Sequence, residues 1–410
     1  MPIWLEILLF ALYVLLGPLL WGFMILAMFE GRRRMEVLLK KTPPLPDPAP
    51  KLTVLIPARN EEANIEKCLA GVLSQDYPNL EVVVTNDRST DATGAILDRL
   101  AAQHPNLHVV HCTQADVLPG WTGKNNAIHN AYEKGAKPLD GDYLLALDAD
   151  VRFTQPDALS VCVRSAMKHN ASLLTLLPAL ESGTFFEGLV IPLTGMISSS
   201  VNAISLTNVD SFKRVAYANG QCMMFTREGY DAIGGHAQVA SLPCEDVPLA
   251  YLVKGSGRRV RVAWGSELCT VRMYDSLGGV YRGLSRVLAV SRNQKTWPVW
   301  AGIAFLVLCG FSLYAAAGYG VWRLEHPLTR YGAVGWLVAV AAHWGAMTVT
   351  LGLMYGWSKN RWWNALLFPV AGVVTLAIYL RALKQCLTGR LEWRGVNYSL
   401  KGGAIATKEG

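Results

Sequence analysis

The stretch Tyr143-Leu-Leu-Ala-Leu-Asp-Ala-Asp150 joins a short apolar run to two acids spaced two residues apart. An apolar run of this length, bounded by polar residues, is typical of a buried strand. Alternate residues of an extended chain point to the same side, so Asp148 and Asp150 can hold a hard divalent cation together with a ligand's phosphates. In isolation the pair also fits a solvated turn. Its interpretation depends on the strands that precede it.

Three further strand patterns precede this stretch, with helical patterns between them. We predict strands at residues 52–57, 81–85, 107–111 and 143–147. We predict a first helix that is capped by Asn60, a second over residues 91–104 and a third over residues 124–134. Strands that alternate with helices imply an α/β fold with a mainly parallel sheet that is covered on both faces. Ligands of such sheets bind beyond the carboxyl ends of the strands.

Polar clusters follow at those ends. They are Pro57-Ala-Arg-Asn-Glu-Glu62, Asn86-Asp-Arg-Ser-Thr-Asp91, Trp121-Thr-Gly-Lys124 and Asp148-Ala-Asp150. We expect Asp87 and Glu61 to accept hydrogen bonds from a base or a ribose, and Lys124 to balance phosphate charge. The alternatives are a turn or cap role for the two acids and an exposed position at a helix start for the lysine.

Two adjacent acids, Glu245 and Asp246, follow the glycine-containing segments Asn219-Gly-Gln221 and Gly234-Gly235. Adjacent side chains usually point apart, so we expect one carboxylate to face the site as a general base and the other to structure the loop. We favour Asp246 as the base, with Glu245 as the second catalytic candidate. A solvated acidic loop is the alternative.

The composition indicates a membrane protein with one large folded part. The chain has 410 residues and a mean hydropathy of +0.24, and it contains charge-free runs at residues 7–29, 296–322, 331–358 and 362–380. Each run is about long enough to cross a hydrocarbon core of roughly 30 Å. Arg32, Arg33 and Arg34 follow the first run, so the positive-inside tendency places the next region in the cytoplasm. The net charge of +7 lies mostly beside such runs, which argues against nucleic-acid binding.

Four crossings would leave the basic tail outside the cell, against the same tendency. The tail contains Arg381, Lys384, Arg390, Arg394 and Lys401. Either the tail is external or one late segment is re-entrant or interfacial. We single out residues 362–380 as the re-entrant candidate, because this run is short and contains Pro369.

Residues 185–206 form another apolar stretch, which lies between the two acidic motifs. If it crossed the bilayer, Asp150 and Asp246 would lie on opposite sides, and a shared site would be impossible. We therefore interpret the stretch as an interfacial helix or loop that presents Phe185, Phe186, Leu189 and Met196 to lipid. A buried core helix is the alternative.

The order of these motifs resembles the family 2 glycosyltransferases and their family 21 relatives over roughly residues 51–295. The resemblance is strongest to the membrane-anchored branch that includes ceramide glucosyltransferase and the hopanoid- and carotenoid-associated sugar transferases. It implies a GT-A fold (Rossmann-like, with a mainly parallel sheet), a nucleotide-diphosphate sugar such as a UDP-sugar, and usually Mg²⁺ or Mn²⁺. It also implies inversion at the anomeric carbon.

The resemblance also implies roles for individual residues. Asp87 and Glu61 would hold the nucleoside. Asp148 and Asp150 would bind the metal and the diphosphate, and Asp246 would be the general base. The predicted substrate-binding set is Pro57, Arg59, Glu61, Asp87, Lys124, Asp148, Gly220, Arg282 and Arg286.

One motif departs from the processive relatives. Their Q-x-x-R-W motif is absent, and Tyr281-Arg-Gly-Leu-Ser-Arg286 stands in its place, which disfavours polymer synthesis. Arg282 and Arg286 lie four residues apart on a predicted helix. They would meet the diphosphate or lipid head groups, or form a plain juxtamembrane basic helix.

We therefore predict a non-processive, inverting glycosyltransferase of the cell's inner membrane that glycosylates a membrane lipid hydroxyl on the cytoplasmic face. A polysaccharide synthase is the alternative within this class. A transporter with a nucleotide-binding domain is disfavoured, because the predicted spans contain no Asp, Glu, Lys or Arg. His343, inside one span, is either a functional group or a neutral histidine bonded to a neighbouring helix. The predicted parts are an N-terminal anchor (1–30), a basic, proline-rich linker (31–50), a cytoplasmic GT-A domain (51–295), a transmembrane bundle (296–383) and a basic tail (384–410).

Overall fold

The computed structural model describes residues 2–290, 295–326, 330–393, 396–399 and 406–408. They divide into two compact units, which we call the sheet unit and the helical unit. The sheet unit comprises Arg32–Glu181, Ala203–Met273 and Gly389–Gly410, and the helical unit comprises Met1–Gly31, Ser182–Asn202 and Tyr274–Thr388. The predicted tail residues Arg394 and Lys401 lie outside the described residues.

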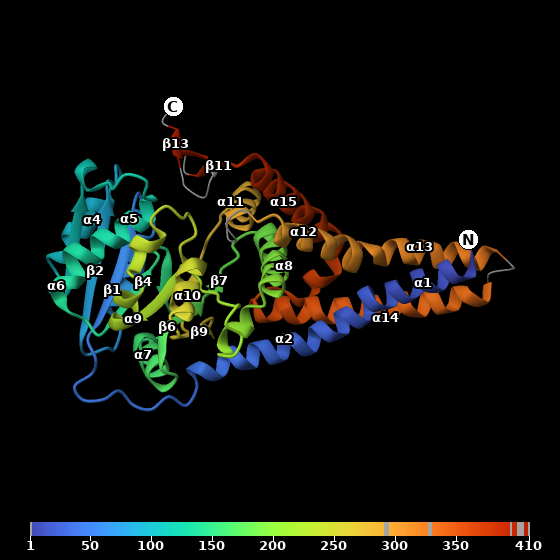
Figure 1. Ribbon diagram of the computed structural model, residues 1–410, viewed down its shortest axis with the longest axis horizontal. Coiled ribbons are helices and arrows are strands. Elements are labelled where there is room, and N and C mark those ends of the chain that lie inside the picture. The colour runs from blue at the N-terminus through green and yellow to red at the C-terminus, as the bar shows by residue number, and fades with distance from the viewer. Residues whose placement is uncertain (1, 291–294, 327–329, 394–395, 400–405, 409–410) are drawn as a thin grey trace. The chain divides into compact units, whose positions relative to one another are not determined.

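A seven-stranded sheet forms the centre of the sheet unit, in the order β3-β2-β1-β4-β8-β6-β9 (Figure 1). Its strands are β1 (Leu52–Ala58), β2 (Leu80–Asp87), β3 (Leu107–Cys112), β4 (Tyr143–Leu147), β6 (Ala171–Leu177), β8 (Cys222–Thr226) and β9 (Arg259–Trp264). Neighbouring strands are parallel except at β8, which is antiparallel to both β4 and β6. This sheet confirms the predicted α/β fold.

Helices cover both faces of the sheet, because successive side chains of a strand point to opposite faces. In β1, Val54 packs into an apolar cluster with residues of α3 and α7, whereas the next residue, Leu55, packs into another cluster with residues of α5 and α10. The helices are α3 (Ile65–Leu73), α4 (Thr93–Ala101), α5 (Gly123–Ala131), α6 (Lys137–Leu139), α7 (Ala158–Lys168), α9 (Arg227–Ala232) and α10 (Asp246–Gly255). A smaller sheet contains β5 (Val151–Phe153), β10 (Cys269–Val271) and β7 (Ala179–Leu180).

The predicted helix cap at Asn60 was wrong. The backbone of Asn60 has a φ of 54°, and its side-chain oxygen accepts a hydrogen bond from the Thr90 N–H at 2.8 Å. Helix α3 begins only at Ile65. Asparagine adopts the left-handed conformation more readily than most residues, so it can join two loops here where the sequence pattern suggested a cap.

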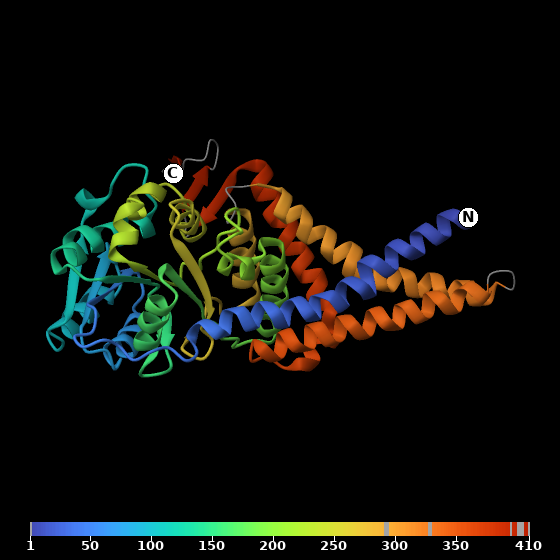
Figure 2. The ribbon, with the colours of Figure 1, turned by 60° about the horizontal axis from the view of Figure 1, so that its bottom comes forward.

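The helical unit contains α1 (Ile3–Val14), the start of α2 (Leu20–Glu36), α8 (Phe185–Asn202), α11 (Leu277–Val290), α12 (Trp297–Ala304), α13 (Ser312–Glu325), α14 (Arg330–Trp357) and α15 (Phe368–Thr388). Helices α13 and α14 lie side by side (Figure 2). The described residues include four helices that are long and apolar enough to cross a membrane: Ile3–Leu39, Trp297–Glu325, Gly332–Trp357 and Trp362–Thr388.

His343 is buried among the long helices of this unit and has a partner on each ring nitrogen. Its Nε2 lies 2.9 Å from the Cys309 carbonyl, which also accepts a hydrogen bond from the Trp21 Nε1 at 2.5 Å. Its Nδ1 lies 3.1 Å from the Tyr13 hydroxyl. A carbonyl only accepts, so Nε2 carries a proton and Tyr13 can donate to Nδ1. These contacts support the interpretation of a neutral histidine bonded to neighbouring helices.

Helix α8 is buried on the face that we expected to meet lipid. Leu189 is 0% exposed and Met196 is 8% exposed, because α8 packs against α11, α12, α14 and α15. The expectation that these two side chains face lipid was wrong, and the buried alternative holds for them. Phe185, the first residue of the helix, is 56% exposed.

A proline inside α8 explains one of its contacts. Pro192 has no N–H, so the Gly188 carbonyl lacks its usual helical donor. Asn364 Nδ2 donates to this carbonyl at 3.3 Å. The Tyr355 hydroxyl donates to the next carbonyl, that of Leu189, at 2.7 Å. Side chains that follow in the sequence therefore bond to backbone carbonyls of α8.

Candidate active site

Lys124 lies at the centre of a network that joins three parts of the chain. Its Nζ is 2.7 Å from Asp148 Oδ1 and 2.8 Å from Glu245 Oε1, and it donates to the Gly220 carbonyl at 3.2 Å. The Gly220 N–H in turn donates to Asp246 Oδ2 at 2.9 Å. Residues that follow different strands therefore meet at one site.

The sheet explains how these residues come together. Asp148 follows β4, and its N–H donates to the Gln221 carbonyl at 3.0 Å, immediately before the antiparallel strand β8. This pairing brings Gly220 beside the end of β4. Helix α5 supplies Lys124 from its first turn, and Asp246 is the first residue of α10.

Gly220 is a glycine for a steric reason. A Cβ atom there would lie 3.0 Å from Glu245 Oε1, 3.3 Å from Lys124 Nζ and 3.4 Å from Asp246 Oδ2. Each distance is tight for a carbon atom beside a side chain that is itself held by partners. The missing side chain therefore makes room for the network.

The electrostatics keep Lys124 charged. Burial alone would lower the pKa of its ammonium group, but the carboxylates of Asp148 and Glu245 raise that pKa well above its ordinary value. For Asp246, burial acts in the other direction. Together with the neighbouring Glu245, it raises the pKa of the Asp246 carboxyl to about 6. A carboxyl with such a pKa is mostly ionised at neutral pH and is a stronger base than an ordinary aspartate.

Asp150 has the features of an unfilled ligand. Its Oδ1 atom is buried and has no hydrogen-bond partner among the residues that the structure describes. Burial, with the nearby carboxylates of Asp148 and Glu61, raises the pKa of Asp150 to about 7. An unpaired carboxylate oxygen next to other acids fits a divalent cation, which attracts the like charges that otherwise repel one another.

The side chains alone do not complete a metal site. Within the described part of the chain, no group of three or more His, Cys, Asp and Glu side chains is arranged to hold a metal ion. Asp148 and Asp150 can therefore supply part of a coordination shell that a ligand's phosphates and water would complete, as is common for Mg²⁺.

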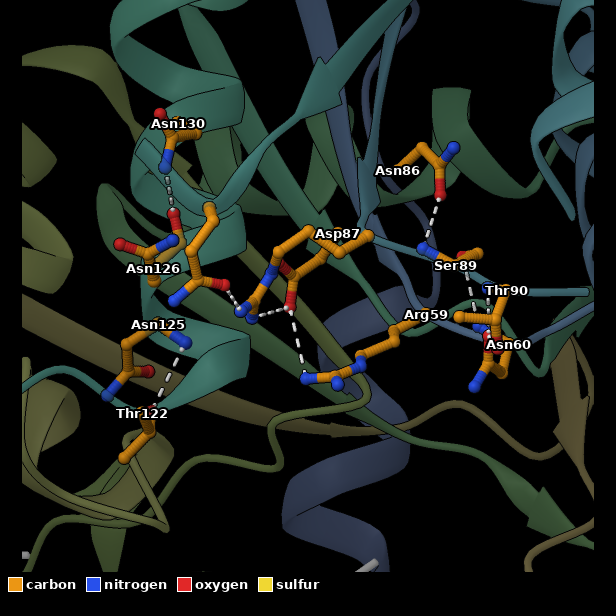
Figure 3. A network of polar contacts seen from close by, with 12 residues as sticks. Arg59, Asn60, Asn86, Asp87, Ser89, Thr90, Thr122, Asn125, Asn126 and Asn130 are labelled. Carbon is orange, nitrogen blue, oxygen red and sulfur yellow. Dashed lines mark hydrogen bonds and ion pairs between the residues drawn. The ribbon is translucent and has the colours of Figure 1, made fainter. Parts of the chain in front are cut away.

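A second cluster surrounds Asp87 at the end of β2 (Figure 3). The buried Asp87 carboxylate lies 2.8 Å from Arg88 Nε and 4.0 Å from Arg59 Nη1. Pro57 of β1 pairs with Thr85 of β2. The paired strands β1 and β2 therefore position both Pro57 and Asp87. The cluster presents arginines and one carboxylate beside the parallel strand ends.

Glu61 lies in the loop between β1 and α3. Its N–H donates to Thr93 Oγ1 at 2.8 Å, and its Oε2 accepts from Asn64 Nδ2 at 3.1 Å. Its charge also reaches Asp150, as the raised pKa of Asp150 indicates. Glu61 is therefore close enough to the acidic site to affect it.

The remaining predicted residues, Arg282 and Arg286, lie on α11 of the helical unit. Their proposed contact with a diphosphate or with lipid head groups stays a prediction.

The sequence interpretation missed Asn125, the residue after Lys124. Asn125 is 0% exposed, and its Nδ2 donates to the carbonyls of Val239, Ala240 and Leu242 at 2.7, 3.2 and 3.0 Å. These carbonyls belong to the loop that leads to Glu245. Figure 3 shows Asn125 beside Thr122, whose hydroxyl accepts the Asn125 N–H at 3.3 Å. An asparagine in the first turn of a helix is common, so its position gave no signal.

Residues 19–406 match the family model described as glycosyl transferase family 21. The chain belongs to glycosyl transferase family 21. It is similar to the 4,4'-diaponeurosporenoate glycosyltransferase of Staphylococcus aureus strain MRSA252, with 25% identity over 352 residues, which cover 85% of this chain and 88% of that protein. The protein of the same name from strain USA300 is 28% identical over the same shares.

A solved structure has a similar fold. It is a mannosyltransferase from Pyrobaculum calidifontis in complex with GDP-Man and Mn²⁺, with a TM-score of 0.50 and 20% identity, and the match covers 82% of this chain and 97% of that one. The family match confirms the predicted resemblance and the predicted glycosyltransferase activity. The similar fold confirms the predicted GT-A class.

Proposed function

We propose that this family 21 protein is an inverting, metal-dependent, non-processive enzyme that transfers a sugar from a nucleotide-diphosphate sugar to a membrane lipid. The observation that carries the proposal is the meeting of Asp148, Glu245 and Asp246 around Lys124 and Gly220. These residues combine a place for a diphosphate with an acid that can accept a proton.

Asp246 supplies the base in this proposal. Direct attack of an acceptor oxygen on the anomeric carbon inverts that centre and requires the acceptor to lose its proton. Asp246 is held by the Gly220 N–H on one oxygen and by the Val247 N–H, at 2.8 Å, on the other. A carboxylate fixed in this way can accept the proton without first reorienting.

The donor end of the site lies at Asp148 and Asp150. They would hold Mg²⁺ or Mn²⁺ with the phosphates of the donor, and the ion would stabilise the charge that develops on the leaving diphosphate. Lys124 contributes a permanent positive charge beside Asp148. The Asp87 cluster would receive the nucleoside, with Glu61, Pro57 and Arg59 around it.

The acceptor proposal rests partly on the relatives. The Staphylococcus aureus proteins are named for 4,4'-diaponeurosporenoate, a name that denotes a carboxylate. A carboxylate acceptor carries no proton at neutral pH and needs no base, whereas a lipid hydroxyl does. The fixed position of Asp246 therefore favours a hydroxyl acceptor for this chain.

The proposed location is the inner membrane, with the catalytic residues on the cytoplasmic side. Arg32, Arg33 and Arg34 follow the charge-free run of residues 7–29, within the first candidate helix Ile3–Leu39. Positively charged residues at the end of a span favour the cytoplasmic side. Residues 51–295, apart from α8, would then form the cytoplasmic catalytic part.

The proposal is tested with membranes that contain the full chain. They are incubated with a panel of radiolabelled nucleotide sugars, with and without EDTA, and the products are separated by lipid extraction and chromatography. We expect label in the lipid fraction, its loss with EDTA, and its return with added Mg²⁺ or Mn²⁺. Label in a polymer would favour a processive synthase. Transfer that EDTA does not reduce would contradict the metal requirement.

A further inference from the structure

We propose that residues 358–388 form a re-entrant hairpin and not a fourth crossing of the membrane. Three segments then cross, and the C-terminal tail returns to the side on which the sheet unit lies. The inference uses contacts within the helical unit only and does not depend on the proposed function.

The direction of α14 follows from its neighbours. It starts after α13 and packs against it, and its His343 lies level with Cys309. Trp357, at the end of α14, packs on Phe29 with a ring separation of 5.2 Å. Phe29 ends the charge-free run of residues 7–29 in the first candidate helix, and the sheet unit begins at Arg32. Helix α14 therefore ends on the sheet-unit side.

After α14 the chain returns only partway into the helical unit. The 3₁₀ segment η9 (Trp362–Leu367) packs on the last turns of α14, where a Cβ on Gly352 would lie 3.8 Å from the Trp362 carbonyl. Phe368 then packs on Phe311 with a ring separation of 5.5 Å. Phe311 lies near the middle of the span Trp297–Glu325. The chain thus reaches only the middle of that span before α15 begins.

Helix α15 then runs back along α12 to α11. Its Tyr379 packs on Gly302 of α12, its Arg381 guanidinium lies 5.0 Å from the Tyr281 ring centre, and its Cys386 Sγ lies 3.6 Å from the Ala289 carbonyl. From its start to its end, α15 therefore contacts first the middle of the span Trp297–Glu325, then α12, and finally α11. Because α11 precedes the span, α15 ends on the side from which residues 358–361 started.

One side of the hairpin tip is covered by protein, whereas Trp362, Trp363 and Leu366 on its other side are 59%, 46% and 51% exposed. Asn364, Ala365 and Phe368 are 7%, 2% and 1% exposed, and Asn364 donates to the carbonyl that Pro192 leaves open in α8. Non-helical backbone at membrane depth is tolerated only where protein or water satisfies its polar groups. The short 3₁₀ turn meets this condition.

The charges agree with three crossings. The sheet-unit side would carry Arg32, Arg33, Arg34, Lys359, Arg361, Lys384 and Arg390. The opposite side would carry two acids, Glu6 and Glu325, and two arginines, Arg323 and Arg330, and Glu6 pairs with Arg323. A fourth crossing would move the basic tail to that neutral side, against the positive-inside tendency.

Labelling of single cysteines tests the inference. In a chain whose natural cysteines are replaced by serine, we would introduce Lys67→Cys in the sheet unit, Lys359→Cys, Lys384→Cys and His326→Cys. Sealed vesicles of each orientation are then treated with a membrane-impermeant maleimide. We expect Lys359→Cys and Lys384→Cys to label in the same vesicles as Lys67→Cys, and His326→Cys in the opposite ones. Labelling of Lys384→Cys together with His326→Cys would overturn the hairpin.

A second measurement keeps the natural cysteines. An epitope is added after residue 410, and trypsin is applied to sealed vesicles of each orientation. The epitope is expected to be removed in the vesicles in which the sheet unit is also cleaved. Its protection in those vesicles, with removal in the others, would contradict the inference even if the cysteine-free chain failed to fold.

Discussion

Lys124 Nζ lies 2.8 Å from Glu245 Oε1, and this ion pair assigns different tasks to two adjacent acids. Glu245 is 3% exposed and is held by the lysine, whereas Asp246 accepts hydrogen bonds from backbone N–H groups. Removing the partner of a buried charge is costly, so Glu245 and Lys124 stabilise the loop as a pair. Asp246 is left as the acid that can exchange a proton with an acceptor.

Replacement of Asp246 tests this division. Asp246→Asn removes the basic oxygen but keeps the size of the side chain, so we expect turnover to fall by about 10² to 10⁴ while donor binding is retained. Initial rates and equilibrium binding of the nucleotide sugar measure the two effects. Near-normal turnover in Asp246→Asn, with loss in Glu245→Gln, would move the base to Glu245. Near-normal turnover in both variants would point to a carboxylate acceptor.

The pH dependence of turnover follows from the same residue. The pKa of Asp246 is raised to about 6, so protonation removes the base as the pH falls through about 6. We expect the rate at saturating substrate to rise between about pH 5 and pH 7 and then to level off. The matched control is Asp246→Asn, whose residual rate should lack this rise. A profile of unchanged shape in that variant would assign the titration to another group.

The space at Gly220 gives a steric prediction. Gly220→Ala places a methyl group 3.0 Å from Glu245 Oε1 and 3.3 Å from Lys124 Nζ, so the ion pair beside Asp246 must shift. A small displacement of a catalytic group can reduce the rate about 10²-fold. Gly255→Ala, at the other end of α10, is the control, because a Cβ there has nothing within 4 Å. Equal rates for the two variants would show that the site tolerates the methyl group.

Asn125 should act as a positioning residue. Asn125→Ala removes a donor from three loop carbonyls. The carbonyls of Val239 and Ala240 keep a backbone N–H donor, so the loss is about 0.5 to 1.5 kcal/mol for each hydrogen bond removed. We expect a lower unfolding temperature and a lower kcat, with the KM for the donor less affected. Asn130→Ala is the control, because Asn130 donates to the carbonyls of Asp116 and Asn126. Equal loss of kcat in both variants would indicate a general effect on folding.

The sheet could be predicted where the signal was local. Strand β4 has the predicted bounds, and β1 to β3 each extend the predicted range by one to three residues, because buried parallel strands form continuous apolar runs that end at polar residues. Strand β8 was not predicted. Its place between β4 and β6 depends on pairing between distant segments, which no local pattern encodes.

The candidate site likewise contains residues that local sequence patterns predicted and contacts that they did not predict. Asp148, Asp150 and Asp246 could be selected because each follows a strand or opens a helix in a recognisable order. The contact of Lys124 with both Asp148 and Glu245 depends on loops whose course the sequence does not specify. The same loops conceal Asn125, since its three acceptors are backbone carbonyls and leave no trace in residue type.

The insertion of α8 limits how this protein can be divided for experiments. A shortened chain that stopped before Trp297 would contain every candidate catalytic acid, but it would also retain α8 without α12, α14 and α15. Leu189, Leu193 and Ile197, now 0 to 1% exposed, would then face water. At about 1.5 to 3 kcal/mol for each large apolar side chain, such exposure favours aggregation. Purification in detergent with all the helices present is therefore the practical route to an active preparation.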